Sequence, residues 1–309
     1  MLVVKNLALR FDREVLRAIS CTFNPDEIYG IIGPSGAGKS SLLKIISGHL
    51  DQTSGEVSLL NKVFPRASQR LIPGHPEIAL VAQDYQLDEY HTCAENIREV
   101  LLHLPIKKRE VLLKKLLKQL GLFHAKELKA HQLSGGEKQR LAIARAIANQ
   151  PKWLLLDEPF SHLDTPMKLK LQESLRLLCK IEKIGLILVS HDVHDIFAIC
   201  TQISLLRKGK LTKNQAPLER YLNLKNLNDA QWFGEVNCLE WKGETIRFRP
   251  NFYDFSEEGI CLECQNFVFN GQTYIHYFYT ENKEAVVLYA TIPLEKRITI
   301  IPKNVQKIQ

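Results

Sequence analysis

Three short, almost uninterrupted apolar runs stand out in the hydrophobic pattern of the chain, and each ends at a polar residue. They are Ile78–Ala82 before Gln83, Trp153–Leu156 before Asp157, and Leu186–Ser190 before His191. Such runs, separated by helical segments, are typical of parallel strands that are covered on both faces. A fourth apolar strand, Ile28–Ile32, is followed by Gly33. Because ligands bind outside the carboxyl ends of the strands in such sheets, we expect these polar ends at one edge of a single sheet.

The segment between the first two of these runs has a helical pattern. Leucines recur at helical spacing over residues 110–120, and Gly121 ends the run. A second helix follows Leu133 and runs to about Asn149. We therefore predict a helical subdomain over about residues 90–150.

Short strands mark both ends of the chain. Residues 1–27 form a first set, which a turn at Asn24-Pro25-Asp26 closes. Past about Tyr221 the helical pattern stops, and short alternating strands follow at residues 236–241, 245–248, 259–268, 273–279, 285–290 and 297–301. Turn residues divide them, which is typical of a small β-barrel. We predict an α/β domain over residues 1–220 and a β-rich accessory domain over residues 221–309.

Composition narrows the class of protein. A chain of 309 residues, 45% of them hydrophobic, is long enough for two globular domains. The net charge of +7 is compatible with a nucleotide, an anionic lipid or a nucleic acid as partner. Much of the excess lies in one leucine-faced helical segment, which we interpret as a solvated helix face. Its basic residues are Lys107, Lys108, Arg109, Lys114, Lys115 and Lys118.

The cysteines and the absence of targeting signals indicate a compartment. We see no secretory leader and no run of about eighteen apolar residues. Seven cysteines are scattered and odd in number, which argues against a disulfide framework. Cys261 and Cys264 form one C-x-x-C without a second pair at zinc spacing, so we do not interpret it as a metal or redox site. The sequence predicts a cytoplasmic protein.

The segment Gly33–Ser40 fits the pattern G-x-x-x-x-G-K-[ST] of a phosphate-binding loop. It lies between a strand and a helical run, as that pattern requires. Its glycines let backbone N–H groups turn towards an anion, and the helix start adds unpaired N–H groups. Lys39 can reach the outer phosphates, and the Ser40 hydroxyl can bind Mg²⁺. The sequence therefore predicts a nucleoside triphosphate site.

Two features leave alternatives open on the residues alone. Ser134 and Glu137 have the spacing of a capping box, yet the two glycines between them equally permit an anion site at the helix start. Phe11 lies about twenty residues before the phosphate loop, where an aromatic ring can stack on adenine, although a single Phe also suits a core.

Aromatic residues in the tail permit a base-stacking platform for nucleic acid. They are Tyr274, Tyr277, Phe278 and Tyr279. No basic residue is interleaved among them, and small barrels need aromatic side chains inside. We therefore favour subunit contact or effector binding for this domain.

Taken together, these residues resemble an ABC-transporter ATPase subunit over residues 1 to about 220. The matching segments are Gly33–Ser40 (Walker A), Gln83 (Q-loop), Leu133–Glu137 (signature sequence), Leu154–Asp157 with Glu158 (Walker B), Ser161–Asp164 (D-loop) and His191 (switch histidine). They occur in family order and at family spacing. His162 departs from the pattern, because the family usually carries alanine there, and this affects how the D-loop packs across a dimer. Arg249-Pro250 and the following strands resemble, more loosely, the oligonucleotide-fold-like accessory domain of importer ATPases.

The resemblance implies a P-loop NTPase cassette with a mainly parallel sheet and a helical insert, followed by a small β-barrel. It also implies a head-to-tail homodimer that holds two ATP molecules between its subunits. In one subunit the ATP-binding residues are Phe11, Gly33, Pro34, Ser35, Gly36, Ala37, Gly38, Lys39, Ser40 and Ser41. The other subunit closes the site with Ser134, Gly135, Gly136 and Glu137.

Catalytic roles follow from the same resemblance. The expected catalytic residues are Lys39, Gln83, Glu158 and His191. The expected Mg²⁺ ligands are Ser40, Gln83 and Asp157. Asp164 is expected to couple the two sites of the dimer. Glu158 would orient or deprotonate the attacking water, while Lys39 and His191 would hold the γ-phosphate.

The implied function is ATP hydrolysis that energises import of a small solute. The implied partners are integral membrane permease subunits and, through them, an external solute-binding protein; no nucleic acid is expected. The chain would be cytoplasmic and peripheral on the inner face of the cell membrane. Inorganic anions, ferric iron, polyamines and sugars all stay open as solutes. One alternative is a soluble ABC protein that acts on ribosomes or DNA, which would usually carry paired cassettes or long coiled-coil inserts. The other is a nucleotide-dependent regulator without turnover, against which the intact catalytic set argues.

Overall fold

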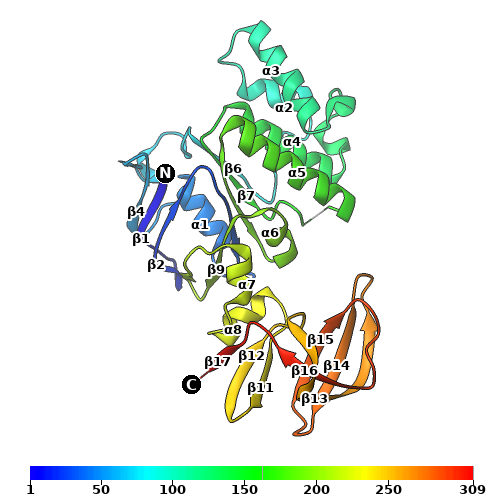
Figure 1. The fold of residues 1–309 in the computed structure, drawn as a ribbon. Helices are drawn as coiled ribbons and strands as arrows, with labels where there is room; N and C mark the ends of the chain where they lie inside the picture. Colours follow the sequence, from blue (N-terminus) through cyan, green and yellow to red (C-terminus); the bar gives the residue numbers. More distant parts are fainter. Residues whose placement is uncertain (162, 309) are drawn as a thin grey trace. The chain divides into compact units, whose positions relative to one another are not determined.

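The computed structural model describes residues 1–161 and 163–308 of the chain (Figure 1). The chain forms two compact units, Met1–Gln215 and Ala216–Gln309. Within the described residues, no helix has both the length and the apolar character that crossing a membrane requires.

A six-stranded sheet lies at the centre of the first unit. Its strands, in order across the sheet, are β10 (Lys210–Leu211), β9 (Gln202–Arg207), β3 (Ile28–Ile32), β8 (Gly185–Ser190), β7 (Trp153–Asp157) and β6 (Ile78–Val81). The strands from β9 to β6 are parallel, and β10 runs antiparallel to β9. Strands β7 and β8 are buried along their whole length, which explains their continuous apolar sequence. The predicted parallel strands are therefore present.

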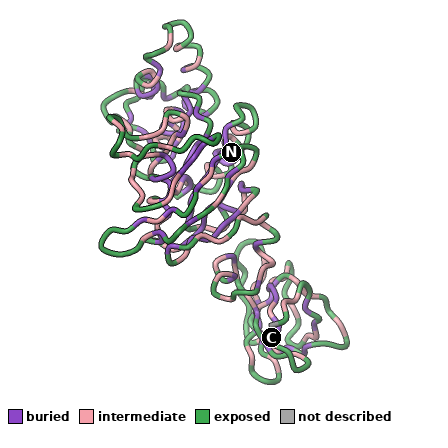
Figure 2. The backbone as a smooth tube through the Cα atoms, turned by 90° about the vertical axis from the view of Figure 1, so that its left-hand side faces the viewer, coloured by how far each residue is buried: buried purple, intermediate pink, exposed green. Residues whose placement is uncertain are grey.

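A second, antiparallel sheet covers helix α1 (Lys39–Ile46) from the side opposite the first. Its order is β2 (Glu14–Phe23), β1 (Leu2–Arg10), β4 (Ser54–Leu59) and β5 (Lys62–Val63). Leu42, Leu43 and Ile46 of α1 are fully buried in one cluster with side chains of both sheets. Figure 2 shows this concentration of buried residues in the first unit. The helix that follows the phosphate loop is thus packed on two sides.

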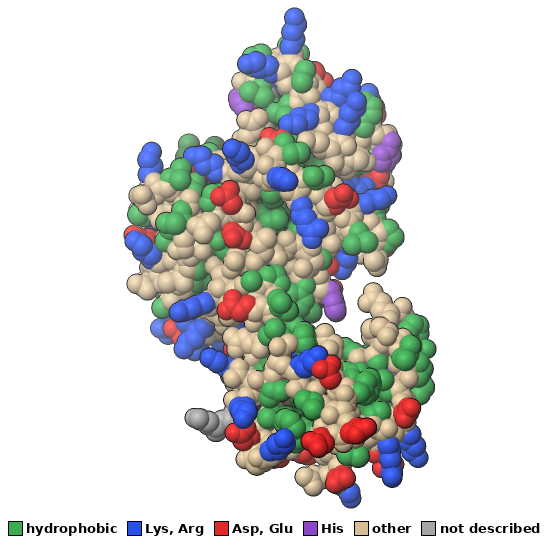
Figure 3. All heavy atoms as spheres, viewed as in Figure 1, with side chains coloured by type: hydrophobic (Ala, Val, Ile, Leu, Met, Phe, Trp, Pro, Cys, Tyr) green, Lys and Arg blue, Asp and Glu red, His purple; other side chains and the backbone are tan. Residues whose placement is uncertain are grey.

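The helical subdomain lies between β6 and β7 in the chain. It contains α2 (Cys93–Val100), α3 (Ile106–Gln119), α4 (Gly135–Ala148) and the short 3₁₀ turns Phe123–Ala125 and Ala130–Gln132. Helix α2 begins with a capping box between Thr92 and Glu95. In α3 the leucines face inward and the lysines lie on the surface, where blue side chains gather in Figure 3. After β7, α5 (Thr165–Glu182) leads to β8 and α6 (Val193–Ile199) leads to β9; a further 3₁₀ turn spans Ala67–Gln69.

The second unit is β-rich. It begins with α7 (Pro217–Leu222), α8 (Leu227–Ala230) and the turn Gln231–Phe233. One antiparallel sheet has the order β11 (Asn237–Trp241), β12 (Glu244–Phe248) and β17 (Gln306–Ile308), and the other has β15 (Ala285–Ala290), β14 (Tyr274–Thr280), β13 (Tyr253–Phe269) and β16 (Arg297–Pro302). Residues of both sheets share one apolar core. Strand β13 begins at Tyr253, not at residue 259 as predicted, because a bulge interrupts its alternation.

The guanidinium of Arg249, which is 1% exposed, donates hydrogen bonds to the carbonyls of Tyr221, Ala230, Gly234 and Glu235. It therefore ties the helical start of the unit to the end of β12. The aromatic residues of β14 do not share one face, because Phe278 lies in the core whereas Tyr277 and Tyr279 are exposed.

Candidate active site

The phosphate loop Gly33–Ser40 connects β3 to α1. Gly36 and Gly38 have φ angles of 75° and 99°, a region that favours glycine. Gly38 is the N-cap residue of α1 and provides no side-chain cap, so the first amides of the helix remain available to an anion. The Lys39 ammonium donates to the carbonyls of Gly33 at 2.8 Å and Pro34 at 3.3 Å, and the residue is 7% exposed. The lysine therefore curls back over its own loop.

Glu158 connects the loop to the next strand. Its Oε1 lies 3.7 Å from the Lys39 Nζ, and its Oε2 lies 2.9 Å from the His191 Nδ1 and accepts from the His191 amide at 3.3 Å. The side chain of Glu158 is 13% exposed, whereas that of His191 is 64% exposed. The ends of β7 and β8 thus bring these three predicted residues together, as the rule for parallel sheets led us to expect.

Asp157 is the last residue of β7 and is buried beside the loop. Its Oδ1 has no hydrogen-bond partner among the described residues. Burial raises the pKa of Asp157, and a hydrogen bond with Ser40 opposes the rise. A buried carboxylate oxygen without a partner, next to a hydroxyl, is a set of hard oxygen donors that fits Mg²⁺.

A cavity of about 750 Å³ surrounds the loop and is large enough for a nucleotide. Besides residues 34–41 it is lined by Gln83 and Glu158, which come from the ends of β6 and β7. Sequence reasoning missed three basic residues on its wall, Arg13, Arg17 and Lys208. They belong to no motif, and only folding brings Arg13, in the turn between β1 and β2, and Arg17, in β2, to the loop. Phe11 lies in the same turn and is 59% exposed, but it does not line the cavity.

The signature residues begin α4 and do not line this cavity within the described part of the chain. The capping box that their spacing permits, one of the two alternatives left open, is present. Glu137 accepts from the Ser134 amide at 3.0 Å and from its hydroxyl at 2.7 Å, and His124 lies 3.1 Å from the same carboxylate. The hydrogen bond from Ser134 is the main reason why the pKa of Glu137 is lowered. The chain therefore does not complete its own phosphate site with these residues.

Asp164 is the N-cap of α5, where its carboxylate accepts from the Met167 amide at 2.9 Å. This contact gives Asp164 a structural role in the single chain, and its coupling role stays a prediction. His162, the predicted departure from the D-loop pattern, lies outside the described residues.

Comparison with known proteins gives consistent matches. Residues 16–161 match the family model described as ABC transporter. The chain is 34% identical over 251 residues to the glucose import ATP-binding protein of Saccharolobus solfataricus, covering 78% of this chain and 70% of that protein. It is 33% identical over 260 residues to the spermidine/putrescine import ATP-binding protein of Thermotoga maritima, covering 83% and 69%. The chain belongs to the ABC-transporter ATP-binding family.

Solved structures agree with this assignment. One is a dimeric ATP-binding cassette in a post-hydrolysis state, bound to ADP and phosphate. The match covers 70% of the present chain and 98% of the cassette, with 27% identity and a TM-score of 0.63. A cassette from Clostridium perfringens, part of an ABC transporter complex, matches 72% and 90% with 26% identity and a TM-score of 0.65. The predicted fold class is confirmed, and the chain is an importer-type ATP-binding subunit and an ATPase. The comparisons do not support the alternatives of a ribosome- or DNA-acting protein or a regulator without turnover.

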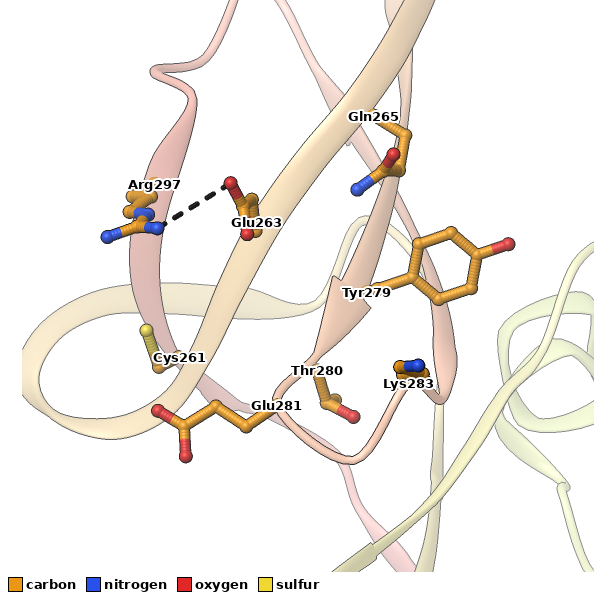
Figure 4. Close-up of a pocket in the computed structure, with 8 residues that line it drawn as sticks. All are labelled: Cys261, Glu263, Gln265, Tyr279, Thr280, Glu281, Lys283 and Arg297. Atoms are coloured by element: carbon orange, nitrogen blue, oxygen red, sulfur yellow. Dashed lines mark ion pairs between the residues drawn. The ribbon is translucent and has the colours of Figure 1, made fainter.

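Another cavity of the ABC ATPase lies in the second unit and has a different character. Its volume is about 660 Å³, and Figure 4 shows the residues that line it. Both charge signs are present, and Arg297 lies 3.7 Å from Glu263. Among the described residues, none of those predicted to bind ATP lines this cavity.

The raised pKa of Asp157 leads to a prediction for Asp157→Asn. Burial raises the pKa of Asp157 above its ordinary value of 3.8, so the folded state favours the neutral carboxyl. The neutral carboxyl supports folding at low pH, and this contribution is lost as the pH rises through the folded pKa, because the ionised carboxylate opposes folding. The nucleotide-free variant should therefore melt about 2–4 °C above the parent at pH 8, with a smaller gap at pH 5. The extra stabilisation by ATP with Mg²⁺, over ATP with a chelator, should disappear.

Thermal unfolding of both proteins at the two pH values measures these effects. Asp195→Asn is the matched control, because burial also raises the pKa of Asp195 but Lys168 lies 3.0 Å from it. That control should retain the Mg²⁺-dependent increment. An unchanged increment in Asp157→Asn would remove Asp157 from the metal site.

Proposed function

We propose that this ABC ATPase hydrolyses Mg·ATP on the phosphate loop with Glu158 as the residue that orients or deprotonates the attacking water. The observation that carries the proposal is the position of Glu158, whose carboxylate lies between the Lys39 ammonium and the His191 imidazole. A carboxylate held in this way can accept a proton from water while the ammonium stays close to the transferred phosphoryl group. His191 holds the carboxylate and, from its exposed position, reaches the γ-phosphate.

Binding of the triphosphate follows from the loop. The amides of residues 34–41 surround the phosphates, and Lys39 exchanges its two carbonyl partners for phosphate oxygens. Ser40, Asp157 and Gln83 are the residues that would hold Mg²⁺, and the unpartnered Oδ1 of Asp157 supports this. When bound, Mg²⁺ supplies charge neutralisation at the phosphate oxygens. Phe11 stacks on adenine, which its exposed position in the turn before β2 permits.

The functional unit is a head-to-tail homodimer. Each chain presents Ser134, Gly135, Gly136 and Glu137 to the ATP on its partner. Two observations support this arrangement. These residues do not line the cavity of their own chain, and the amides of Gly135 and Gly136 at the start of their helix are not used by the capping box. Asp164, in the segment after Walker B, couples the two sites.

A membrane permease subunit binds beside the Q-loop, and the segment from Asp84 to Asn96 carries the motion. A groove of about 620 Å³ is lined by Tyr85 and Gln86 together with residues of β6 and α4. Tyr85 and Gln86 have φ angles of 59° and 48°, and Arg145 of α4 donates to the Gln86 carbonyl. The exposed ring of Tyr90 adds aromatic contact area. The strained turn at Tyr85 and Gln86 thus links Gln83, at the nucleotide site, to the groove that would bind the permease.

The physiological setting is import across the cell membrane. The chain is cytoplasmic and peripheral on the inner face, and an external binding protein delivers the solute to the permease. The relatives are named for import of glucose and of spermidine/putrescine, which supports a small polar solute. The ATPase domain spans residues 1–220, with its helical subdomain at about 90–150, and residues 221–309 form the accessory domain.

Mixing two inactive variants tests the dimer and the site together. Lys39→Ala removes the phosphate contact, and Ser134→Arg blocks the signature end. Each variant alone should be inactive, whereas mixed dimers contain one intact site, made from the loop of the Ser134→Arg chain and the signature of the Lys39→Ala chain. Random pairing makes about half of the dimers mixed, and each mixed dimer has one intact site out of two. ATP turnover should therefore return to about a quarter of the parent value. A mixture as inactive as its components would reject shared sites.

A further inference from the structure

The helix that begins with the signature residues also contacts the segment after Walker B in the same chain. Gln139 lies one turn into α4 and is 2% exposed. Its Nε2 donates a hydrogen bond to the carbonyl of Pro159, the residue next to Glu158. A single side chain therefore joins the signature helix to the backbone of the residue that follows Glu158.

The side chain of Gln139 is not explained by stability alone. Its Oε1 is buried and has no hydrogen-bond partner among the described residues. A buried acceptor without a partner costs folding free energy, which an apolar side chain of the same length would avoid. What glutamine provides, and methionine would not, is the donor to Pro159.

The backbone around Glu158 needs such support. Glu158 has a φ of 52°, a left-handed conformation that non-glycine residues hold only where their surroundings enforce it. Its amide donates to the Val189 carbonyl at 3.0 Å, and its carbonyl accepts from the Ser161 hydroxyl at 3.1 Å. The bond from Gln139 to the next carbonyl is the contact that comes from α4.

Two neighbouring contacts make this connection stiff. A Cβ on Gly136 would lie 2.6 Å from Cδ2 of Leu163, so the first turn of α4 packs directly on the D-loop segment. One turn later, Nη1 of Arg140 lies 3.3 Å from Sδ of Met167 in α5. A displacement of α4 therefore moves the segment that carries Glu158, because packed side chains transmit displacement.

We propose that Gln139 is a positioning residue, whose amide holds Pro159, and through it the carboxylate of Glu158, to the signature helix of the same chain. This inference rests on the proposed function, in which that helix closes the ATP site of the partner. The helix that closes the ATP site of the partner thus also fixes the position of Glu158 on its own chain. Gln139 thereby links the two sites within one chain.

The pair of inactive variants described above tests this assignment when Gln139→Met is added to one chain at a time. The Ser134→Arg chain supplies Glu158 to the intact site, so Gln139→Met on that chain should lower turnover by about tenfold or more, because small misplacements of catalytic groups are costly. On the Lys39→Ala chain, which supplies only the signature, the loss should be less than about threefold.

Uniform Gln139→Met chains provide a second measurement. Their kcat should fall by about tenfold, while the Kd for ATP stays within about twofold and the melting temperature does not fall. Gln172→Met, at another buried glutamine on α5, is the matched control and should retain kcat.

Three results would overturn the inference: equal losses on the two chains, a Kd that weakens in parallel with kcat, or an unchanged kcat. If the parent pair has no turnover, the proposed function fails, and the uniform chains still decide on Gln139 through kcat and Kd.

Discussion

Glu158→Gln should lower ATP turnover by about 10³-fold and leave the protein as a dimer with ATP bound. Glutamine retains the size of the side chain but cannot accept a proton from water, and loss of a positioned base costs about 10²–10⁴ in rate. It also removes the negative charge between Lys39 and His191, so a bound triphosphate meets less repulsion. Since the ATP is not consumed, it continues to hold the two chains together.

Release of phosphate from labelled ATP measures the turnover. Light scattering after size exclusion, with and without ATP and Mg²⁺, measures the dimer. Glu173→Gln on the exposed side of α5 is the matched control and should behave as the parent. A variant that still turns over ATP, or that remains monomeric with ATP, would contradict the role assigned to Glu158.

Lys39→Ala should weaken ATP binding by about tenfold or more and abolish detectable hydrolysis. The lysine is buried and donates to the Gly33 and Pro34 carbonyls, so its ammonium lies over the loop. A charge-assisted contact to phosphate in this setting contributes about 1.5–3 kcal/mol, which corresponds to at least a tenfold change in Kd. The same charge is needed in the transition state, so turnover suffers more than binding does.

Titration with a fluorescent ATP analogue gives the Kd, and a steady-state assay gives the turnover. Lys44→Ala tests for a general charge effect, because Lys44 is an exposed lysine of the same helix, α1. It should change the Kd by less than about twofold. Equal effects of both substitutions would show that net charge, not the position of Lys39, attracts the nucleotide.

Features that repeat along the chain were visible in the sequence, and features that depend on one tertiary contact were not. The buried strands β6, β7 and β8 have long apolar runs because both their faces are covered, so the polar residues at their ends could be assigned to one edge. Gln139 carries no such signal, because a glutamine within a helix is usually a surface residue and only the fold buries it against Pro159.

The second unit illustrates the same limit in strands. The predicted strand over residues 259–268 is the later part of β13, where buried and more exposed positions alternate over Ile260–Glu263. The earlier part was missed because the register shifts between Phe255 and Ile260, both of which pair with Ile300. The four residues between them have no partner on β16, which breaks the period of two on which the prediction depends.

The placement of α1 between two sheets has a consequence for how fast the protein can capture its substrate. Helix α1, which follows the phosphate loop, is packed on both sides. Binding of the nucleotide therefore costs the loop little conformational entropy and requires no folding step. The recognition surface is thus ready before the ligand arrives, and the slower rearrangements of a working cycle must take place elsewhere in the molecule.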